Sequence, residues 1–296
     1  MKSYSEYLQR FFPGIKVQKL SVNAGFTCPN RDGTISYGGC IYCRNDSFTP
    51  SYCDNTKSVK VQIEEGKRFF SRKYKGMKYL AYFQSFTATH HTDIQYLKNL
   101  YLEAANCPDI VGLIIGTRPD SLTSSITMLL QELNEKLPVF LEIGAETSFD
   151  ETLRLINRNH TWDDVEEAVK RASAAGIPCG LHLIAGLPGE GEEKILKTVK
   201  RACMLPIDTI KMHQLQILYD TTLYRKWIKG EIEISPLEFE EYIELCLKII
   251  RITPENIVIE RFISQSPPEM VAAPKWNIKN YQFNNLLFNR LKETSI

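Results

Sequence analysis

Short apolar segments alternate with amphipathic segments along most of the chain. Six runs rich in Val, Ile, Leu and aromatic residues have the length of strands and are apolar enough to be covered on both faces. They lie at residues 16–22, 78–83, 110–115, 138–143, 180–185 and 209–214. Segments with helical periodicity separate them, which is typical of consecutive strand–helix units. The pattern therefore predicts an α/β fold.

Two of the helical segments have clear boundaries. Residues 162–174 follow Thr161, and Asp164 three residues further on completes a capping-box pattern, while Gly176 ends the helix. Residues 192–203 carry their apolar side chains on one stripe. Six strand–helix units over about 200 residues predict an open, partial TIM-like (β/α)6 barrel, because a closed barrel needs eight. In such a barrel the chemistry lies at the carboxyl ends of the strands.

The pattern changes after the sixth predicted strand. Residues 239–250 present one apolar helical face, residues 257–263 form a further strand candidate, and residues 281–292 form a last helix. We therefore divide the chain into a barrel core at residues 1–217 and a C-terminal α/β extension at residues 218–296 that packs on the barrel.

Composition adds a cellular context. The 296 residues are 43% hydrophobic and 24% charged, which is ordinary for a soluble globular protein. The first residues lack the apolar core of a signal peptide, and no apolar run is long enough to span a bilayer. We expect a cytoplasmic protein with no membrane partner. Its eight cysteines then do not indicate a disulfide framework, and Cys107, Cys203 and Cys246 are interpreted as buried apolar residues in helices.

The net charge is only +1, but the charge is unevenly distributed. Eight basic residues between positions 57 and 78 face only two acidic ones, a local net charge of +6. They are Lys57, Lys60, Lys67, Arg68, Arg72, Lys73, Lys75 and Lys78. This stretch is either a solvated helix face or a surface that contacts phosphates, and the sequence leaves both interpretations open.

Three cysteines, Cys28, Cys40 and Cys43, follow the first predicted strand with the spacing C-x11-C-x2-C. Three thiolates are one fewer than the usual ligand set of a cubane iron–sulfur cluster, so one iron would be free to bind something other than protein. Zinc is the alternative, because Cys53 could complete a four-cysteine site, although Cys53 has no C-x2-C partner. Tyr42 lies between the last two cysteines, where its ring could flank a planar ligand.

This C-x-aromatic-C ending resembles the signature of the radical SAM superfamily. The resemblance implies a partial barrel and a [4Fe–4S] cluster whose open iron binds S-adenosylmethionine (SAM). Reductive cleavage of SAM then yields a 5′-deoxyadenosyl radical. The long first gap departs from the usual C-x3-C-x2-C spacing and, with residues 23–33, resembles YhcC/YtqA-type proteins, which are relatives of the elongator catalytic subunit. Later segments agree with this branch, namely residues 82–87, 116–120, 142–148, 182–190, 211–215 and 273–276.

The resemblance also implies SAM-binding residues. Glu146 follows the fourth strand, where related enzymes place Gln or Glu near SAM. Arg158 matches an arginine that faces the methionyl carboxylate, a group suited to a fork of donors. His182 is either a polar residue aimed at SAM or an ordinary core histidine, and Gly186 opens a turn where the backbone approaches the adenine. Tyr42 completes this set, and the three cysteines are the metal ligands.

Two substrates are compatible with the resemblance. The elongator-like relatives act on wobble uridine, so we expect tRNA as a partner and the C5 side chain of that uridine as the target. The basic stretch, with Arg261, Lys275, Trp276 and Lys279, could then contact RNA by charge and stacking. A small metabolite is the second possibility, and a zinc-bound interaction module is the non-enzymatic one. A reductant protein of the flavodoxin or ferredoxin type is implied for the enzyme.

Overall fold

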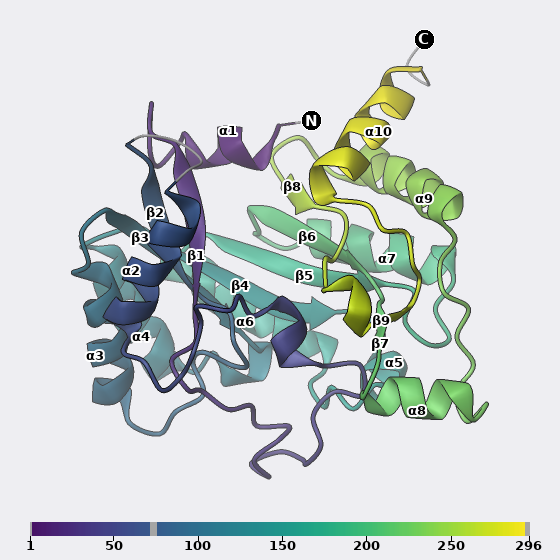
Figure 1. Cartoon of the computed structure of the whole chain (residues 1–296), viewed down its shortest axis with the longest axis horizontal. Coiled ribbons are helices and arrows are strands. Elements are labelled where there is room, and N and C mark those ends of the chain that lie inside the picture. The colour runs from purple at the N-terminus through teal and green to yellow at the C-terminus, as the bar shows by residue number, and fades with distance from the viewer. Residues whose placement is uncertain (1, 72–75, 294–296) are drawn as a thin grey trace.

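The computed structural model describes residues 2–71 and 76–293. Its centre is a curved, entirely parallel sheet of seven strands in the order β1-β2-β3-β4-β5-β6-β8 (Figure 1). All six predicted barrel strands are present, as β1 (Val17–Val22), β2 (Lys78–Phe83), β3 (Ile110–Thr117), β4 (Val139–Glu146), β5 (Cys179–Ala185) and β6 (Thr209–Gln214). The predicted partial barrel is therefore confirmed.

Helices connect successive strands and cover one face of the sheet. They are α2 (Val59–Phe70), α3 (Ile94–Ala105), α4 (Ser124–Asn134), α5 (Asp150–Leu155), α6 (Trp162–Ala174) and α7 (Glu192–Cys203). The two predicted helix boundaries are correct, and α6 begins with the predicted capping box between Thr161 and Asp164. Short 3-10 turns occur at Asn45–Phe48 (η1), Pro119–Ser121 (η2) and Pro268–Met270 (η3).

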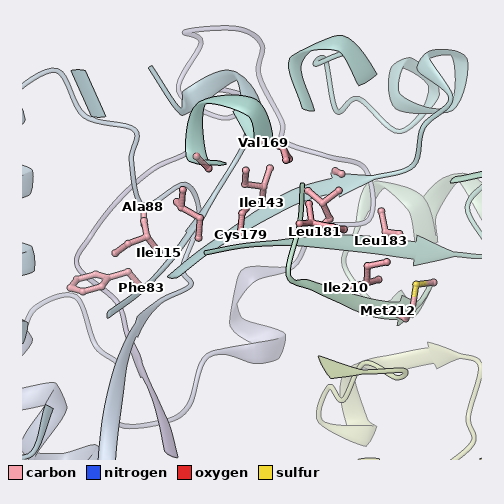
Figure 2. Packing of buried hydrophobic residues seen from close by; sticks show 14 of the residues in the cluster. Phe83, Ala88, Ile115, Ile143, Val169, Cys179, Leu181, Leu183, Ile210 and Met212 are labelled. Carbon is pink, nitrogen blue, oxygen red and sulfur yellow. The ribbon is translucent and has the colours of Figure 1, made fainter. Parts of the chain in front are cut away.

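The main core lies between this helical layer and the sheet. Alternate side chains from the strands point into it, among them Phe83, Ile143 and Met212, and they meet helical residues such as Val169 of α6 (Figure 2). Burying one such side chain is worth about 1.5–3 kcal/mol. The cysteines that were expected to be apolar core residues lie here too, since Cys107 and Cys246 are buried and Cys203 packs against the cluster.

The opposite, inner face of the sheet has a different composition. At the amino ends of the strands it is apolar, and α1 (Tyr4–Leu8) packs there, with Tyr7, Phe12 and Phe140 in one buried cluster. Nearer the carboxyl ends, the inward positions carry charged groups, among them Glu142, Lys211 and Glu260. The inner face is therefore closed by aromatic side chains at one end and lined by polar groups at the other.

The C-terminal part of the chain contributes to the same sheet. The strand candidate at residues 257–263 is β8 (Val258–Arg261), which pairs in parallel with β6 after the crossover through α9 (Phe239–Ile252). The barrel therefore has one strand more than the six predicted, because the parallel edge of β6 accepts a further strand. The division of the chain into domains at residue 217 remains a prediction. The parallel sheet continues across this position, because β8 pairs with β6.

The remaining elements pack around this edge. They are α8 (Thr222–Ile228), the antiparallel pair β7 (Ile217–Leu218) and β9 (Val271–Ala273), and α10 (Asn280–Glu293), which contacts α9. In the part of the chain that the structure describes, no helix has both the length and the apolar character needed to cross a membrane.

Candidate radical SAM site

The cysteine segment is a long loop between β1 and α2 that runs past the carboxyl ends of the strands (Figure 1). Backbone hydrogen bonds fix it to the barrel, because Ile41 N–H donates to Ile156 O (3.0 Å) and Leu223 N–H donates to Ile41 O (2.8 Å). Gly39 makes the turn possible. Its φ is +75°, and a Cβ there would lie 2.9 Å from Arg31 Nε.

Asn30 holds the loop from inside. This fully buried side chain donates from Nδ2 to Asn157 O (2.6 Å), to Arg158 O (3.0 Å) and to Cys40 Sγ (3.7 Å). Asn157 adopts a left-handed backbone conformation at φ +55° and donates back to Gly39 O (2.8 Å). The cysteine loop and the segment after α5 are therefore connected directly.

Cys43 lies close enough to Cys40 and Cys28 for their charges to act on its thiol. Burial raises the pKa of the Cys43 thiol to about 11, and the charges of Cys40 and Cys28 contribute to the same shift. Arg158 Nη1 donates to Cys40 Sγ (3.8 Å), and Arg31 Nη2 donates to Cys43 O (3.1 Å). Metal ligation requires thiolates, so Cys43, whose burial opposes ionisation, depends on nearby positive charge. Arg31 supplies part of that charge.

Cys53 lies apart from this trio. Its thiol is buried and donates to Ser21 O (3.0 Å), and burial raises its pKa to about 12, with Tyr52 and Lys57 as the groups that lower it. Within the described residues, no group of three or more His, Cys, Asp or Glu side chains is arranged so that it could hold a metal ion. The packing of Cys53 thus gives the four-cysteine zinc hypothesis no support.

Glu146 and Arg158 form the second part of the site. A bulge between Gly144 and Glu146 shifts the register of β4 against β5, and Glu146 has φ +64°, an uncommon conformation for a residue with a side chain. Arg158 Nη2 donates to Gly144 O (2.6 Å) and lies 3.3 Å from Glu146 Oε1. A Cβ on Gly144 would lie 2.5 Å from Arg158 Nη2, so a larger residue here would displace the guanidinium.

The guanidinium of Arg158 retains its proton strongly. Burial lowers the pKa of its guanidinium, but the charges of Glu146 and Cys40 raise it by more, to well above the usual value. Burial and the charges of Glu146 and Cys40 also raise the pKa of Tyr42 well above its usual value. Tyr42, Glu146, Arg158 and Cys40 therefore share one electrostatic environment.

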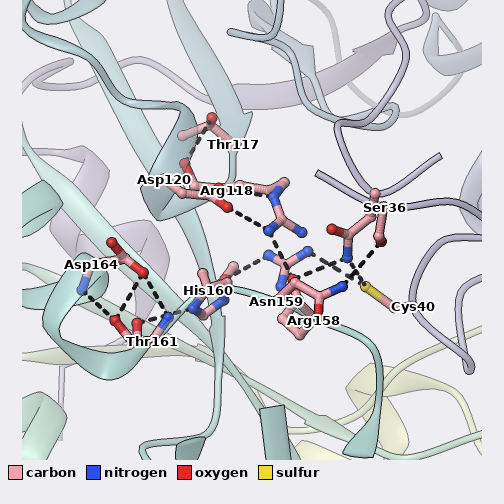
Figure 3. A network of polar contacts seen from close by, with 12 residues as sticks. Ser36, Cys40, Thr117, Arg118, Asp120, Arg158, Asn159, His160, Thr161 and Asp164 are labelled. Carbon is pink, nitrogen blue, oxygen red and sulfur yellow. Dashed lines mark hydrogen bonds and ion pairs between the residues drawn. The ribbon is translucent and has the colours of Figure 1, made fainter. Parts of the chain in front are cut away.

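A second buried arginine positions the first. Arg118 forms a fork with Asp120 (2.9 and 2.6 Å) and donates from Nη2 to Arg158 O (2.8 Å), as Figure 3 shows. Arg118 is 1% exposed. Sequence reasoning assigned no role to Arg118, Asp120 or Asn30, although two of them stand in the segment 116–120. Four orphaned atoms remain beside this network, since Asn30 Oδ1, Arg118 Nη1, Arg158 Nε and His160 Nε2 are buried with no partner in the described part of the chain.

The inner face below this site carries an ionic network centred on Glu142. Its Oε2 accepts from Tyr82 Oη (2.5 Å), His182 Nε2 (2.7 Å) and Lys211 Nζ (2.7 Å), and its Oε1 accepts from Lys19 Nζ (2.7 Å). Burial raises the pKa of Glu142, but the two lysines lower it by more, to well below its usual value. Glu260 is a second carboxylate of the network, 2.8 Å from Lys19 and 3.4 Å from Lys211. Sequence reasoning missed this network, apart from His182.

Two predicted SAM contacts, His182 and Gly186, lie in β5 and directly after it. His182 belongs to the Glu142 network, and among the described contacts only its Nδ1 is left for a ligand. Gly186 ends β5 with φ +88°, and a Cβ there would lie 3.1 Å from Leu237, so the turn needs glycine as expected. Both residues remain predicted contacts.

The basic stretch is less available than its charge suggests. Lys57 pairs with Glu65 (2.7 Å), Lys67 with Glu64 (2.9 Å), and Lys78 with Asp109 (2.6 Å). Arg72, Lys73 and Lys75, which complete the stretch, lie outside the described residues. The paired lysines reduce the field that a phosphate backbone would meet.

Comparison with known proteins identifies the class. The model of the radical SAM superfamily matches residues 25–202, and the model of the radical SAM C-terminal domain matches residues 207–293. The chain belongs to the radical SAM superfamily. It is 33% identical to the uncharacterized protein YtqA of Bacillus subtilis over 269 residues, which are 91% of this chain and 83% of YtqA. It is 35% identical to protein YhcC of Escherichia coli over 264 residues, which are 89% of this chain and 83% of YhcC.

Elongator-type proteins are more distant relatives. A tRNA uridine(34) acetyltransferase of Methanocaldococcus jannaschii is 26% identical over 192 residues, which are 63% of this chain and 34% of that protein. The solved structure of Elp3 from Methanocaldococcus infernus superposes with a TM-score of 0.69 at 19% identity. It covers 95% of this chain, and the chain spans 63% of that archaeal chain. The predicted resemblance to YhcC/YtqA-type proteins related to the elongator subunit is confirmed.

The residues present suit the cofactors of this superfamily, a [4Fe–4S] cluster and SAM. The donor set consists of three sulfur atoms, with N–H donors from Asn30 and Arg158 directed at one of them. Hydrogen bonds to the sulfur ligands are a common means of tuning such clusters. Arg158 Nε is buried without a partner in the described structure and offers a further donor at the same place.

Proposed function

We propose that this protein is a radical SAM enzyme that remodels the C5 side chain of wobble uridine in tRNA. The observation that carries the proposal is the sequence similarity to a tRNA uridine(34) acetyltransferase over 63% of this chain. The partial barrel, whose inner face carries the polar network around Glu142, is compatible with it. A flavodoxin- or ferredoxin-type protein would supply the electron.

Named residues take separate roles in this proposal. Cys28, Cys40 and Cys43 would hold the cluster, and the guanidinium of Arg158 would hold the carboxylate of SAM. When bound, these cofactors supply a one-electron reductive cleavage that produces a 5′-deoxyadenosyl radical. Glu146 keeps Arg158 charged and oriented, and the apolar end of the barrel excludes water behind the reacting groups.

The remaining predicted contacts complete the SAM site. Tyr42 would flank the adenine, Gly186 would let the backbone approach it, and His182 would reach SAM through Nδ1. Arg118 is a positioning residue, because it touches the carbonyl of Arg158 and no predicted ligand.

A small metabolite is the second candidate substrate, and one observation favours it. Three of the five basic residues described between positions 57 and 78 are paired with acids of the same protein. They are Lys57, Lys67 and Lys78. A surface neutralised in this way binds RNA more weakly, since affinity for a phosphate backbone depends on free cations.

The test compares tRNA nucleosides from a strain that lacks the gene and from its parent by mass spectrometry. We expect a modified uridine of position 34 to be lost in the deletion strain and to return with the wild-type gene. The Cys40→Ala gene should not restore it, whereas Cys53→Ala should. Identical nucleosides in both strains would contradict the tRNA proposal and favour the small metabolite.

A further inference from the structure

A bulge in β8 places two successive side chains on the inner face of the barrel. Ile210 of β6 pairs with Ile259, but the next residue, Lys211, pairs with Arg261, so Glu260 is the extra residue. Bulges of this kind redirect a side chain that would otherwise point to the other face. Glu260 lies 3.4 Å from Lys211, and Arg261 Nη2 lies 3.2 Å from His213 Nδ1. Lys211 and His213 are two positions apart on β6 and so share the inner face.

The contacts of His213 fix which of its nitrogens carries the proton. Arginine can only donate, so His213 Nδ1 accepts from Arg261 Nη2, and it also lies 2.8 Å from Ser264 Oγ. Burial and the charge of Arg261 lower the pKa of His213 well below its usual value, so the ring is neutral. The single proton of a neutral ring is then on Nε2, which is a donor.

Two donors from the inner face of the barrel therefore lack an acceptor among the described residues. His213 Nε2 and Arg261 Nε are both buried, and neither has a hydrogen-bond partner in the described part of the chain. Leaving a buried donor unsatisfied is costly, and most such groups in native proteins have a protein, water or ligand partner. The two side chains are in contact through Arg261 Nη2 and His213 Nδ1, so both donors belong to one local site.

The charged side chains described around these two donors include one more cation than carboxylates. Lys19 and Lys211 are matched by the carboxylates Glu142 and Glu260. Burial lowers the pKa of His182, so this ring adds no charge. Arg261 is a third cation, and within the described residues no carboxylate lies within ion-pair distance of it. A partly buried guanidinium of this kind calls for an anion.

We propose that Arg261 and His213 form a subsite for an anionic oxygen group of the substrate. The shared chemistry is an oxygen acceptor with negative charge, either the phosphodiester of an RNA or the carboxylate of a small acid. The assignment to the substrate rests on the proposed function, in which the inner face of the barrel receives the substrate. Anion binding at this position can be measured without catalytic turnover, so its test is separate from the test of the proposed function.

The experiment uses anaerobically reconstituted holoenzyme and titrates inorganic phosphate and, separately, acetate at constant ionic strength. Binding is followed by calorimetry and by the rise of the unfolding temperature, which a ligand of the native state produces. We expect saturable binding of one of the two anions. Loss of a charge-assisted hydrogen bond should weaken it about tenfold or more in Arg261→Gln. Arg251→Gln, which removes an exposed arginine of α9, is the charge-matched control and should bind as the wild type does.

Two further comparisons distinguish the two kinds of anion and control for a folding defect. Preference for phosphate supports a phosphodiester, and preference for acetate supports a small carboxylic acid. Arg261→Lys keeps the charge but lacks the Nε donor, so it should fold and bind with intermediate affinity. Binding of neither anion, equal affinity in Arg261→Gln, or loss of binding when SAM is present would overturn the subsite. Unchanged tRNA nucleosides would contradict only the proposed function.

Discussion

Replacing Glu142 with glutamine tests the inner-face network. The glutamate accepts four hydrogen bonds of 2.5–2.7 Å, and three of them converge on one oxygen. Glutamine has the same shape, but its NH2 group donates and cannot accept, so it would face side chains that also donate. Of the two carboxylates in the network, only Glu260 would then remain to pair with Lys19 and Lys211. Removing one partner of a buried ion pair costs about 3–5 kcal/mol.

That cost converts into a measurable temperature shift. The entropy of unfolding is about 2.1 cal/mol/K per residue, which is roughly 0.6 kcal/mol/K for 296 residues. The unfolding temperature of Glu142→Gln should therefore be lower by about 5–8 °C at pH 7, as measured by calorimetry. Glu244→Gln, an exposed change on α9, should shift it by less than about 1 °C.

The contribution of Glu142 to the free energy of unfolding depends on pH. The pKa of Glu142 is well below its usual value in the folded state, so its contribution is fully present above the unfolded pKa of about 4.3. That contribution is lost as pH falls through the folded pKa. The difference between wild type and Glu142→Gln should be constant from pH 6 to 8, roughly, and should shrink in acid. A shift below about 2 °C at pH 7 would refute the reasoning, because the network would then contribute little.

Three other predictions concern Gly144, Tyr82 and the binding of tRNA. Gly144→Ala should weaken SAM binding about tenfold by displacing the guanidinium of Arg158, while Gly191→Ala, where a Cβ meets nothing within 4 Å, should bind normally; equal affinities would be inconsistent with the assigned role. Tyr82→Phe removes a buried hydrogen bond to a charged group and should lower the unfolding temperature by about 2–5 °C, whereas the exposed Tyr281→Phe should not. Binding of tRNA, measured by filter retention, should fall steeply with salt, and a salt-independent affinity would argue against phosphate contacts.

The hydrophobic pattern was sufficient to predict the strands but not their partners. Each barrel strand is a short apolar run, because it is covered by helices on one face, and such runs are recognisable locally. Residues 257–263 were recognised as a strand in the same way. Their pairing with β6 depends on the crossover through α9, and no local signal in the sequence reports that.

The site was predictable where residue type and spacing determine the chemistry. The three cysteines and the aromatic residue between the last two are of this kind. Arg118 and Asn30 act through carbonyls of residues far along the chain, so only the fold reveals them. The pairing of Glu142 with Lys211 could have been predicted from the sequence, because charged residues inside buried strands are costly unless they pair.

The central claim is that three cysteines hold a cluster that cleaves SAM. The most direct measurement reconstitutes wild type, Cys40→Ala and Cys53→Ala anaerobically with iron and sulfide. It then counts bound metal and the 5′-deoxyadenosine formed from SAM with a chemical reductant. Wild type and Cys53→Ala should each hold about four iron and four sulfide and form 5′-deoxyadenosine, and Cys40→Ala should lose that product. Wild-type protein that binds stoichiometric zinc, takes up no iron and leaves SAM intact would contradict the claim.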